Sequence, residues 1–400
     1  MTSTLPTREL STPVVSSTVR RRAMFALAMG GFGIGTTEFV AMGLLPQIAG
    51  GLGVSEPTAG HVITAYALGV VVGAPLIAAL TARTPRKVLL IALMVAFTLG
   101  NAAAIVAPNY GGLMVARFVA GLPHGAYFGV ASLVAAHLAA RGQRAKAVAT
   151  VMAGLAVANV IGVPVAAWIG QHLGWRSAFA VVAVIGTATV LAICAWVPPL
   201  QDLRTSDPRT ELGALRRGQV WLTLIVGTVG FGGMFAVYTY VASTMTEVAG
   251  LPMTLVPVVL MVYGLGMVAG NVLGGVLADR ALTRGLFTVL AALVVVLAVF
   301  AVAARNPYTA LPVLFLIAVA GSALVPGLQT RLMDVAADAQ TLAAALNHSA
   351  LNIANAFGAW IGGVVIAAGF GYTAPALVGA GLAAAGLAVL ALAVATARRR

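Results

Sequence analysis

The sequence predicts an all-α membrane protein of twelve transmembrane helices, arranged as two six-helix halves with both termini in the cytoplasm. Three observations support this fold class: the composition, an internal repeat and the distribution of basic residues. Of the 400 residues, 60% are hydrophobic and only 8% are charged, whereas about a quarter of a soluble domain is charged. This composition excludes an ordinary soluble protein.

Twelve apolar segments, each long enough to cross a bilayer as a helix, follow one another along the chain. They lie at 23–49, 58–82, 87–107, 111–138, 145–170, 176–197, 219–247, 253–278, 284–304, 308–330, 341–368 and 372–396. The first segment follows three arginines but is too long for the apolar core of a signal peptide, so we expect it to be retained.

Two polar stretches mark the domain boundaries. Residues 1–19 are rich in Ser, Thr and Pro and predict a disordered cytoplasmic tail. The longest polar stretch between apolar segments, 198–218, predicts a cytoplasmic linker. The two expected halves are therefore 20–197 and 219–400.

Basic residues are concentrated on one side of the predicted membrane. Of the 23 Lys and Arg residues, 20 fall at the termini or in loops after even-numbered segments. Only Arg176 and Arg305 fall on the other side, and Arg117 lies inside the fourth segment. The positive-inside rule then places both termini in the cytoplasm. The net charge of +13 reflects this orientation, and we expect no nucleic-acid partner.

The two halves carry an internal repeat. Gly69 and Gly73 recur as Gly266 and Gly270 at an offset of 197 residues. A further match, at an offset of 196, is VANVIG (157–162) with IANAFG (353–358). A nearly constant offset over several segments predicts two halves related by an axis along the membrane normal.

Three polar side chains inside apolar segments are functional candidates. Glu38 lies in the middle of the first segment, where a charge is costly unless it faces a polar cavity or is protonated part of the time. Arg117 lies about 9 Å inside the fourth segment, and His124, seven residues later, lies on nearly the same helical face. Glu38 and Arg117 have no charged counterpart in the second half, which favours function over scaffolding. The alternatives are snorkelling for Arg117 and simple hydrogen bonding for His124.

The loops and helices around these residues resemble the signature motifs of the Major Facilitator Superfamily. The loop after the second segment reads LTARTPRK (80–87), and its repeat reads LADRALTR (277–284). In the family this motif is thought to latch the halves together at the cytoplasmic face, and the resemblance implies these latch residues: Arg83, Arg86, Lys87, Asp279 and Arg280. Because Ala82 replaces the motif's Asp, the second latch is expected to be the intact one. Alternatively, Arg86 and Lys87 only set topology.

The fifth segment reads GLAVANVIGVPVAAWIG (154–170) and is similar to the antiporter motif of the family. The matching residues are Gly154, Gly162, Pro164 and Gly170. Pro164 is expected to bend the helix, and the small residues are expected to let it slide against the other half. With TTEFVAMGLLP (36–46) and GLPHGAYFGV (121–130), the chain resembles the twelve-span drug:proton antiporter branch and its arabinose-efflux-permease and chloramphenicol-exporter relatives.

The resemblance implies a proton-coupled antiporter that exports a small amphipathic drug, antibiotic or natural product across the plasma membrane by alternating access. Proton coupling is expected at Glu38, Arg117 and His124. The expected substrate-cavity residues are Thr37, Tyr66, His124, Tyr127, Tyr238, Asn347 and Asn352. The alternatives are a sugar or sugar-like efflux transporter or facilitator and, more distantly, a membrane-embedded enzyme or sensor.

Little in the sequence indicates an enzyme. It contains no HExxH motif, and its one cysteine, Cys194, cannot form an internal disulfide. We expect no enzymatic activity, cofactor or metal. The expected partners are the substrate, protons and the lipid bilayer, with the protein acting as a monomer.

Overall fold

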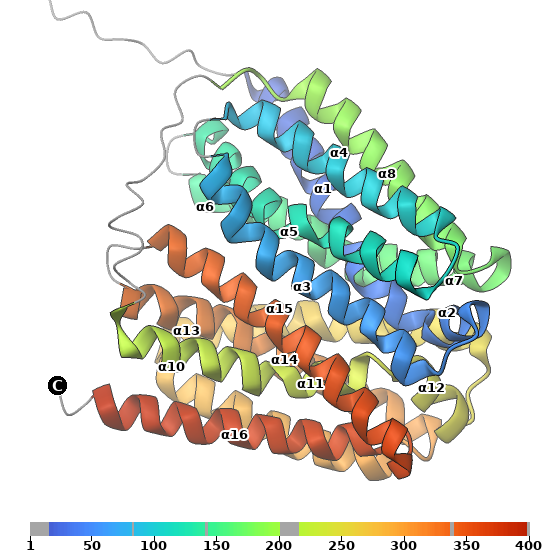
Figure 1. The fold of residues 1–400 in the computed structure, drawn as a ribbon. Helices are drawn as coiled ribbons and strands as arrows, with labels where there is room; N and C mark the ends of the chain where they lie inside the picture. The colour runs from blue at the N-terminus through green and yellow to red at the C-terminus, as the bar shows by residue number, and fades with distance from the viewer. Residues whose placement is uncertain (1–15, 82–83, 141–142, 201–215, 337–339, 398–400) are drawn as a thin grey trace, which may run out of the picture.

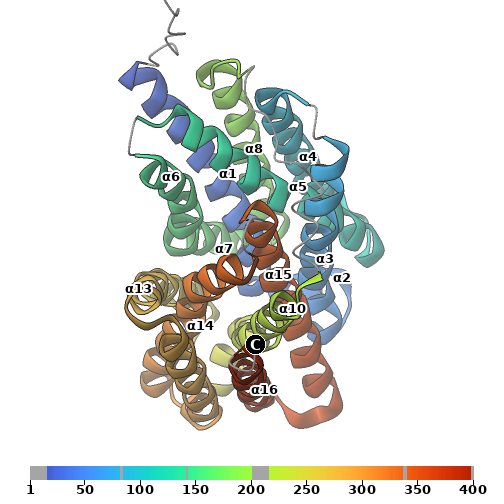
Figure 2. The same cartoon turned by 90° about the vertical axis from the view of Figure 1, so that its left-hand side faces the viewer.

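A computed structural model describes residues 16–81, 84–140, 143–200, 216–336 and 340–397. The described residues form helices and turns, with no strand among them. The helices gather into two bundles, the first formed by α1 to α8 and the second by α10 to α16 (Figure 1). Seen along the helices, one bundle lies beside the other, with α15 at the boundary between them (Figure 2).

The first bundle contains α1 (Ser17–Gly43), α2 (Leu45–Leu52), α3 (Glu56–Leu80), α4 (Arg86–Val106), α5 (Tyr110–Leu138), α6 (Arg144–Val157), the π-helical turn η1 (Ala158–Gly162), α7 (Val163–Leu173) and α8 (Arg176–Trp196). The second bundle contains α10 (Gly218–Ile225), η3 (Val226–Gly230), α11 (Phe231–Tyr238), α12 (Val241–Ser243), η4 (Thr244–Val248), η5 (Met253–Leu255), α13 (Val256–Ala303), α14 (Pro307–Ala336), α15 (Gln340–Val365), η6 (Ile366–Phe370) and α16 (Ala374–Ala397).

The first helix differs from the prediction at both ends. It begins at Ser17, inside the predicted tail 1–19, with the Ser16 side chain accepting a hydrogen bond from the Val19 amide. It ends at Gly43, and the rest of the predicted segment forms the separate helix α2. Pro46 explains the break, because proline lacks an amide hydrogen and is tolerated in the first turn of a helix. Residues 1–15 of the predicted tail and 201–215 of the predicted linker lie outside the described residues.

The number of continuous helices is smaller than the predicted number of spans. Among the described residues, 11 helices are long and apolar enough to cross a membrane. One of them, Met253–Ala303, has 51 residues, about 77 Å of helix, whereas a bilayer core is about 30 Å thick. Its backbone is non-helical at Ala281 (φ −161°, ψ 73°), between the predicted segments 253–278 and 284–304. Eleven helices instead of twelve predicted segments are therefore counted because two of the segments join into one helix across the kink at Ala281.

The internal repeat is visible in the contacts between helices. Gly69 of α3 is so close to α5 that a Cβ there would overlap the Phe118 carbonyl oxygen. A Cβ at Gly266 of α13 would likewise overlap the Phe315 carbonyl oxygen of α14, and Gly266 and Phe315 each lie 197 residues after Gly69 and Phe118. A second such set is Gly73 with Leu122 and Gly270 with Val319. The two bundles therefore share the same small-residue packing between equivalent helices.

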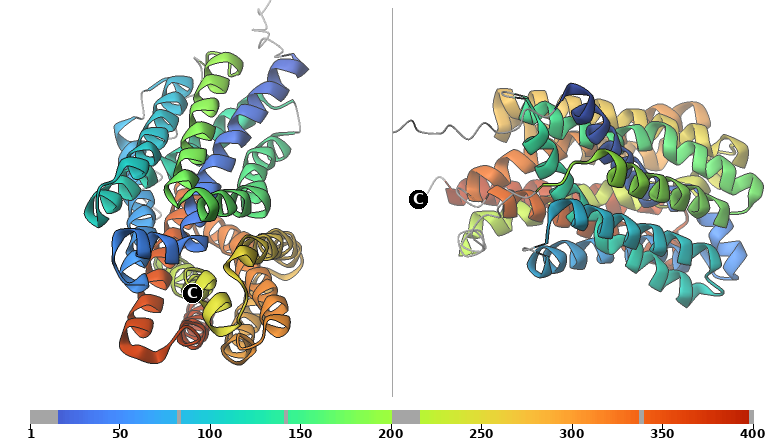
Figure 3. Two further views of the ribbon diagram at one scale, coloured as in Figure 1. Left: turned by 90° about the vertical axis from the view of Figure 1, so that its right-hand side faces the viewer. Right: turned by 90° about the horizontal axis from the view of Figure 1, so that it is seen from above.

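The first and last helices of the described residues reach the same end of the molecule. The start of α1 and the end of α16 lie at one end, here called the terminal end (Figures 1 and 3). The helices α2 and α12 lie at the opposite end, here called the far end (Figure 1).

The outer surface of both bundles is apolar. Large hydrophobic side chains are exposed on most of the long helices, among them Leu99, Val106, Val115, Leu173, Val184, Leu191, Val272, Val295, Val302, Leu377 and Leu392. Exposed apolar surface of this extent suits contact with lipid rather than water.

Candidate functional site

Arg117 is fully buried on α5 and held from several sides. Its Nη1 donates a hydrogen bond to Thr37 Oγ1 (2.9 Å), and its Nη2 donates to the Thr37 carbonyl oxygen (3.0 Å). Its Cζ lies 4.3 Å from the centre of the Tyr66 ring and 5.4 Å from that of Phe179. Cations over aromatic faces are stabilised by the ring quadrupole. Arg117 therefore does not snorkel, and the structure brings it together with two predicted cavity residues, Thr37 and Tyr66.

The hydrogen-bond network continues from Thr37 into α4. The Thr37 hydroxyl donates to Asn101 Oδ1 (2.6 Å), while the Asn101 amide donates to the Phe97 carbonyl oxygen (2.9 Å). Asn101 was not among the predicted residues, although a lone amide in the predicted segment 87–107 was a usable signal. The two hydrogen bonds fix the Thr37 rotamer and, through it, the guanidinium.

His124 lies on the same side of α5 as Arg117, as the sequence predicts. Its Nδ1 is 3.1 Å from the Tyr66 hydroxyl, and the ring of that tyrosine covers Arg117. Beyond it, Phe128 meets the His124 ring edge-on and lies parallel to the ring of His348 on α15, with centroids 6.2 Å apart. His348, which was not among the predicted residues, thus joins the second bundle to this cluster.

Glu38 is buried on α1 with 7% of its surface exposed. Arg117 acts on it electrostatically, but the guanidinium is bonded to Thr37 instead of the carboxylate. From the second bundle, the side-chain amide of Asn355 comes within interaction range of the carboxylate, yet neither amide atom makes a hydrogen bond of standard geometry. Glu38 is therefore near a cation without being locked to it.

Aromatic rings from both bundles surround the region near Glu38. Phe39 stacks on Phe235 (6.2 Å between centroids) and meets Tyr238 at 5.8 Å. Tyr238 in turn stacks on Tyr263 of α13 at 3.9 Å. These four rings, with Glu38 and Asn355, are called the bundle interface below. The predicted cavity residue Tyr238 thus lies where the bundles meet.

Several buried polar atoms lack hydrogen-bond partners. Among the described residues they include Asn159 Oδ1, Thr239 Oγ1, the Tyr263 hydroxyl, Ser322 Oγ, Asn352 Oδ1 and both amide atoms of Asn355. Asn352 donates its amide to the His348 carbonyl oxygen (3.0 Å), and Asn347 is buried on the same helix. Most buried polar groups in proteins are paired. Unpaired groups here are available to water or to a bound molecule.

Tyr127 occupies a position different from the predicted one. Its ring is fully buried in the core of the first bundle, and its hydroxyl donates to the Leu27 carbonyl oxygen of α1 (2.8 Å). The side chain therefore ties α5 to α1 and does not join the bundle interface. The prediction failed because the sequence does not show which face of α5 meets α1.

The glycines of the antiporter motif also face a different partner from the one predicted. A Cβ at Gly154, Gly162 or Gly170 would meet Ala28, Thr36 or Leu44, all on or beside α1 in the same bundle. The expectation that these small residues face the other half was therefore wrong.

The other bundle is contacted by different parts of the antiporter segment. The backbone of Asn159 in η1 lies against Gly264 of α13. Pro164 follows this π-helical turn and lines an apolar groove of about 220 Å³ between α7 and α13. Such π turns are frequent at functional sites.

The predicted cytoplasmic latch is only partly described. Arg83 lies outside the described residues, and Arg86 is buried at the start of α4. Lys87 donates to the Cys194 carbonyl oxygen (2.8 Å). Asp279 and Arg280 are exposed beside the kink at Ala281, and within the described ranges no ion pair joins Asp279 to another helix. The structure therefore does not show the second latch closed.

Contacts between the bundles close the interface at both ends. At the far end, the Ser243 hydroxyl donates to a Glu56 carboxylate oxygen, and Thr64 donates to the Ala356 carbonyl oxygen (3.3 Å). Towards the terminal end, the stacked pair of Phe128 and His348 bridges the bundles. The buried site thus lies between two closures.

Comparison with known proteins connects this architecture to transport. The family model described as Major Facilitator Superfamily matches residues 27–341. The inner membrane transport protein YdhP of Escherichia coli (strain K12) is 42% identical over 357 residues, which cover 89% of this chain and 92% of that protein. A chloramphenicol resistance protein of Streptomyces lividans is 34% identical over 354 residues, covering 88% and 89%.

A solved structure shares the fold at low identity. The crystal structure of a bacterial homologue of the human lysosomal transporter Spinster, inward-facing and occupied, has a TM-score of 0.71 and 17% identity. The match covers 95% of this chain and 96% of the other.

Proposed function

Because this chain belongs to the Major Facilitator Superfamily and is a multi-pass membrane transporter, we propose that it is a proton-coupled antiporter that exports a small amphipathic molecule across the plasma membrane. The proposed topology has twelve spans, with α13 counted as two helices that meet at Ala281. An even number agrees with the start of α1 and the end of α16 lying at one end of the molecule (Figure 1). The excess of basic residues there makes the terminal end cytoplasmic.

The observation that carries the proposal is the environment of Glu38. The carboxyl is buried where the bundles meet, near an arginine that is bonded elsewhere and beside an amide from the other bundle. An intramembrane carboxyl of this kind is costly when charged and unpaired, so its proton and a bound substrate are alternative ways to relieve the same cost. Because the proton and the substrate compete for this one carboxyl, the entry of protons is coupled to the export of substrate.

The proposed cycle uses rocking of the bundles about the interface. When the far end opens, Glu38 takes a proton and substrate leaves. When the terminal end opens, the proton leaves to the cytoplasm and substrate binds. Asn355 suits both states, because an amide can donate to a carboxylate and accept from a carboxylic acid.

The substrate class follows from the groups available at the bundle interface. Four aromatic rings supply apolar faces for stacking. The unpaired Tyr263 hydroxyl and Asn355 amide supply hydrogen-bonding groups. Small-molecule sites with such a mixture of groups bind mainly through apolar area and use few polar groups for orientation. A small molecule with an apolar ring and a few hydroxyl or amide groups fits this description.

The test begins with a susceptibility screen of a pump-deficient host with and without the gene, repeated with an uncoupler. For each compound found, uphill export is measured for the wild type, for Glu38→Gln and for the control Asp334→Asn, which removes an exposed carboxylate from α14. We expect Glu38→Gln to abolish uncoupler-sensitive export while keeping downhill exchange. Asp334→Asn should match the wild type.

The same experiment distinguishes a facilitator from a proton antiporter. If Glu38 only orients a hydroxylated solute, Glu38→Gln changes export little and the uncoupler has no effect in either protein. That result would reject proton antiport while leaving transport intact.

A further inference from the structure

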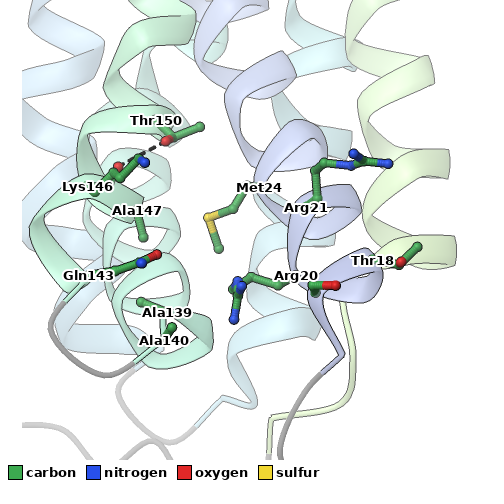
Figure 4. Close-up of a pocket in the computed structure, with 11 residues that line it drawn as sticks. Thr18, Arg20, Arg21, Met24, Ala139, Ala140, Gln143, Lys146, Ala147 and Thr150 are labelled. Atoms are coloured by element: carbon green, nitrogen blue, oxygen red, sulfur yellow. Dashed lines mark hydrogen bonds between the residues drawn. The ribbon is translucent and has the colours of Figure 1, made fainter.

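A pocket separate from the bundle interface lies at the terminal end of the first bundle. Its volume is about 400 Å³, within the roughly 300–1,000 Å³ of small-ligand sites. It is formed by the start of α1, the end of α5 and the start of α6 (Figure 4). The lining residues are Ser17, Thr18, Arg20, Arg21, Met24, Ala139, Ala140, Gln143, Lys146, Ala147 and Thr150.

The charge of this pocket is positive on both walls. Arg20 of α1 points towards α6, whereas the Arg21 side chain points away from it, and Lys146 comes from α6 on the opposite side (Figure 4). No acidic residue lines the pocket. Within the described part of the chain, no ion pair neutralises Arg20 or Lys146. The described residues that line the pocket therefore carry an excess of positive charge, which favours an anion.

The polar and apolar groups are arranged in layers. Gln143 lies across from Arg20 and can hydrogen-bond to an anion's oxygens, while Met24 and Ala147, both buried, form an apolar surface between α1 and α6 (Figure 4). Arginine matches phosphate geometry with paired N–H donors, and lysine adds a point charge. A phosphate group attached to an apolar or glycerol-like body suits this arrangement.

From these observations we propose that the pocket between α1 and α6 binds the phosphate group of an anionic phosphoester. Two sources share this chemistry: the headgroup of an anionic phospholipid and a soluble phosphate ester. The pocket lies at the level where the apolar helices begin, and basic pockets between helices at this level bind lipid headgroups.

Binding has a structural consequence within the first bundle. A phosphate contacted by Arg20 and Lys146 would connect α1, which carries Glu38, to α6, which leads into the antiporter segment. The two helices already meet closely at Gly154 and Ala28. The bound anion would therefore stabilise the packing of α1 on α6 near their charged ends.

The test measures ligand binding on the purified full-length protein in neutral detergent. Thermal unfolding is followed during titration with phosphatidylglycerol, with phosphatidylcholine, and with glycerol 3-phosphate. The variants are Arg20→Gln and Lys146→Gln, which lie on different helices. The matched control is Arg22→Gln, because Arg22 is exposed, two residues from Arg20 and absent from the pocket lining.

We expect saturable stabilisation of the wild type by phosphatidylglycerol and none by phosphatidylcholine. Each pocket variant should raise the half-saturating concentration roughly fivefold, since one cation near the membrane surface contributes about 1 kcal/mol. Arg22→Gln should leave it unchanged. Stabilisation by glycerol 3-phosphate alone would identify a soluble ester as the ligand and also supports the site.

Two outcomes would overturn the proposal. One is no saturable stabilisation by either phosphate ligand. The other is an equal effect of Arg22→Gln and Lys146→Gln, which would mean that the lipid responds to overall charge and not to this pocket. If Arg20→Gln does not fold, Lys146→Gln still decides between these results.

Discussion

At the scale of single residues, Asn355 is the most informative test of the proposed site. Its amide is buried beside Glu38 and makes no standard hydrogen bond. A buried polar group without a hydrogen-bond partner destabilises the folded state by about 1–3 kcal/mol. Replacing Asn355 with an apolar residue of similar size removes this cost. We therefore expect Asn355→Leu to abolish uncoupler-sensitive export while leaving the unfolding temperature equal or higher.

The matched control for this variant is Asn101→Leu. Asn101 accepts from Thr37 and donates to Phe97, so both partners would lose a buried hydrogen bond. We expect Asn101→Leu to lower stability by about 1–3 kcal/mol. Equal destabilisation by the two variants would show that Asn355 is a structural residue instead of a functional one.

Arg117 provides a second prediction at this scale. Two nitrogens of its planar guanidinium donate hydrogen bonds to Thr37, and one face of the group lies over the Tyr66 ring. A lysine ammonium cannot make this set of contacts. We expect Arg117→Lys to reduce uphill export at least about tenfold, equivalent to about 1.4 kcal/mol. The control is Arg176→Lys, which changes an arginine that bonds the Ala107 carbonyl oxygen outside the site. Export by Arg117→Lys at the wild-type rate would mean that charge alone is sufficient.

The sequence identified the charged members of the site better than the neutral ones. Glu38, Arg117 and His124 stand out because charged and titratable groups are rare in apolar segments. Asn355 and Asn101 did not, because lipid-facing and core-facing surfaces are both apolar and the pattern does not reveal which face a helix turns inward. A usable signal existed for Asn355, since the repeat pairs it with Asn159 in VANVIG and IANAFG.

At the scale of helices, close contacts between α3 and α5 and between α13 and α14 predict equivalent mutational costs. A Cβ at Gly73 would overlap backbone atoms of Leu122, and one at Gly270 would overlap the Val319 carbonyl oxygen. We expect Gly73→Ala and Gly270→Ala each to destabilise the protein by about 1–3 kcal/mol, because the helices must separate. Thermal unfolding in detergent measures the effect.

The control for these substitutions lies on α5. A Cβ at Gly129 would have no neighbouring atom within 4 Å outside its own helical turn, so Gly129→Ala adds no clash. It should stabilise the helix slightly, by about 0.5–1 kcal/mol, through reduced freedom of the unfolded chain. A loss of stability at Gly129 similar to that at Gly73 would contradict the packing explanation.

The boundaries of helices were less predictable than their order along the chain. Apolar length located the long helices, and Pro46 and Pro164 marked positions where the helix changes. The kink at Ala281 lies in the charged stretch between the predicted segments 253–278 and 284–304, so the sequence indicated its position. The π turn at Ala158–Gly162 carries no strong sequence signal, because it depends on the packing of neighbouring helices, which hydropathy does not encode.

At the scale of the whole molecule, the two closures of the bundle interface should have opposite effects on access to Glu38. The far end is closed by Ser243 with Glu56, and the terminal side by Phe128 with His348. Alternating access requires that weakening one closure favours opening at that end. The single native cysteine, Cys194, can be removed with Cys194→Ser to allow labelling of one introduced thiol.

The reporter is Asn355→Cys in the Cys194→Ser background, labelled by a membrane-impermeant maleimide in right-side-out and everted vesicles. Adding Ser243→Ala should speed labelling in right-side-out vesicles, where the far end faces the reagent. Adding Phe128→Ala should speed labelling in everted vesicles, because the stacked bridge to His348 is lost. Faster labelling from both sides in either variant would indicate general loosening of the fold, and the two closures would then not be the elements that alternate.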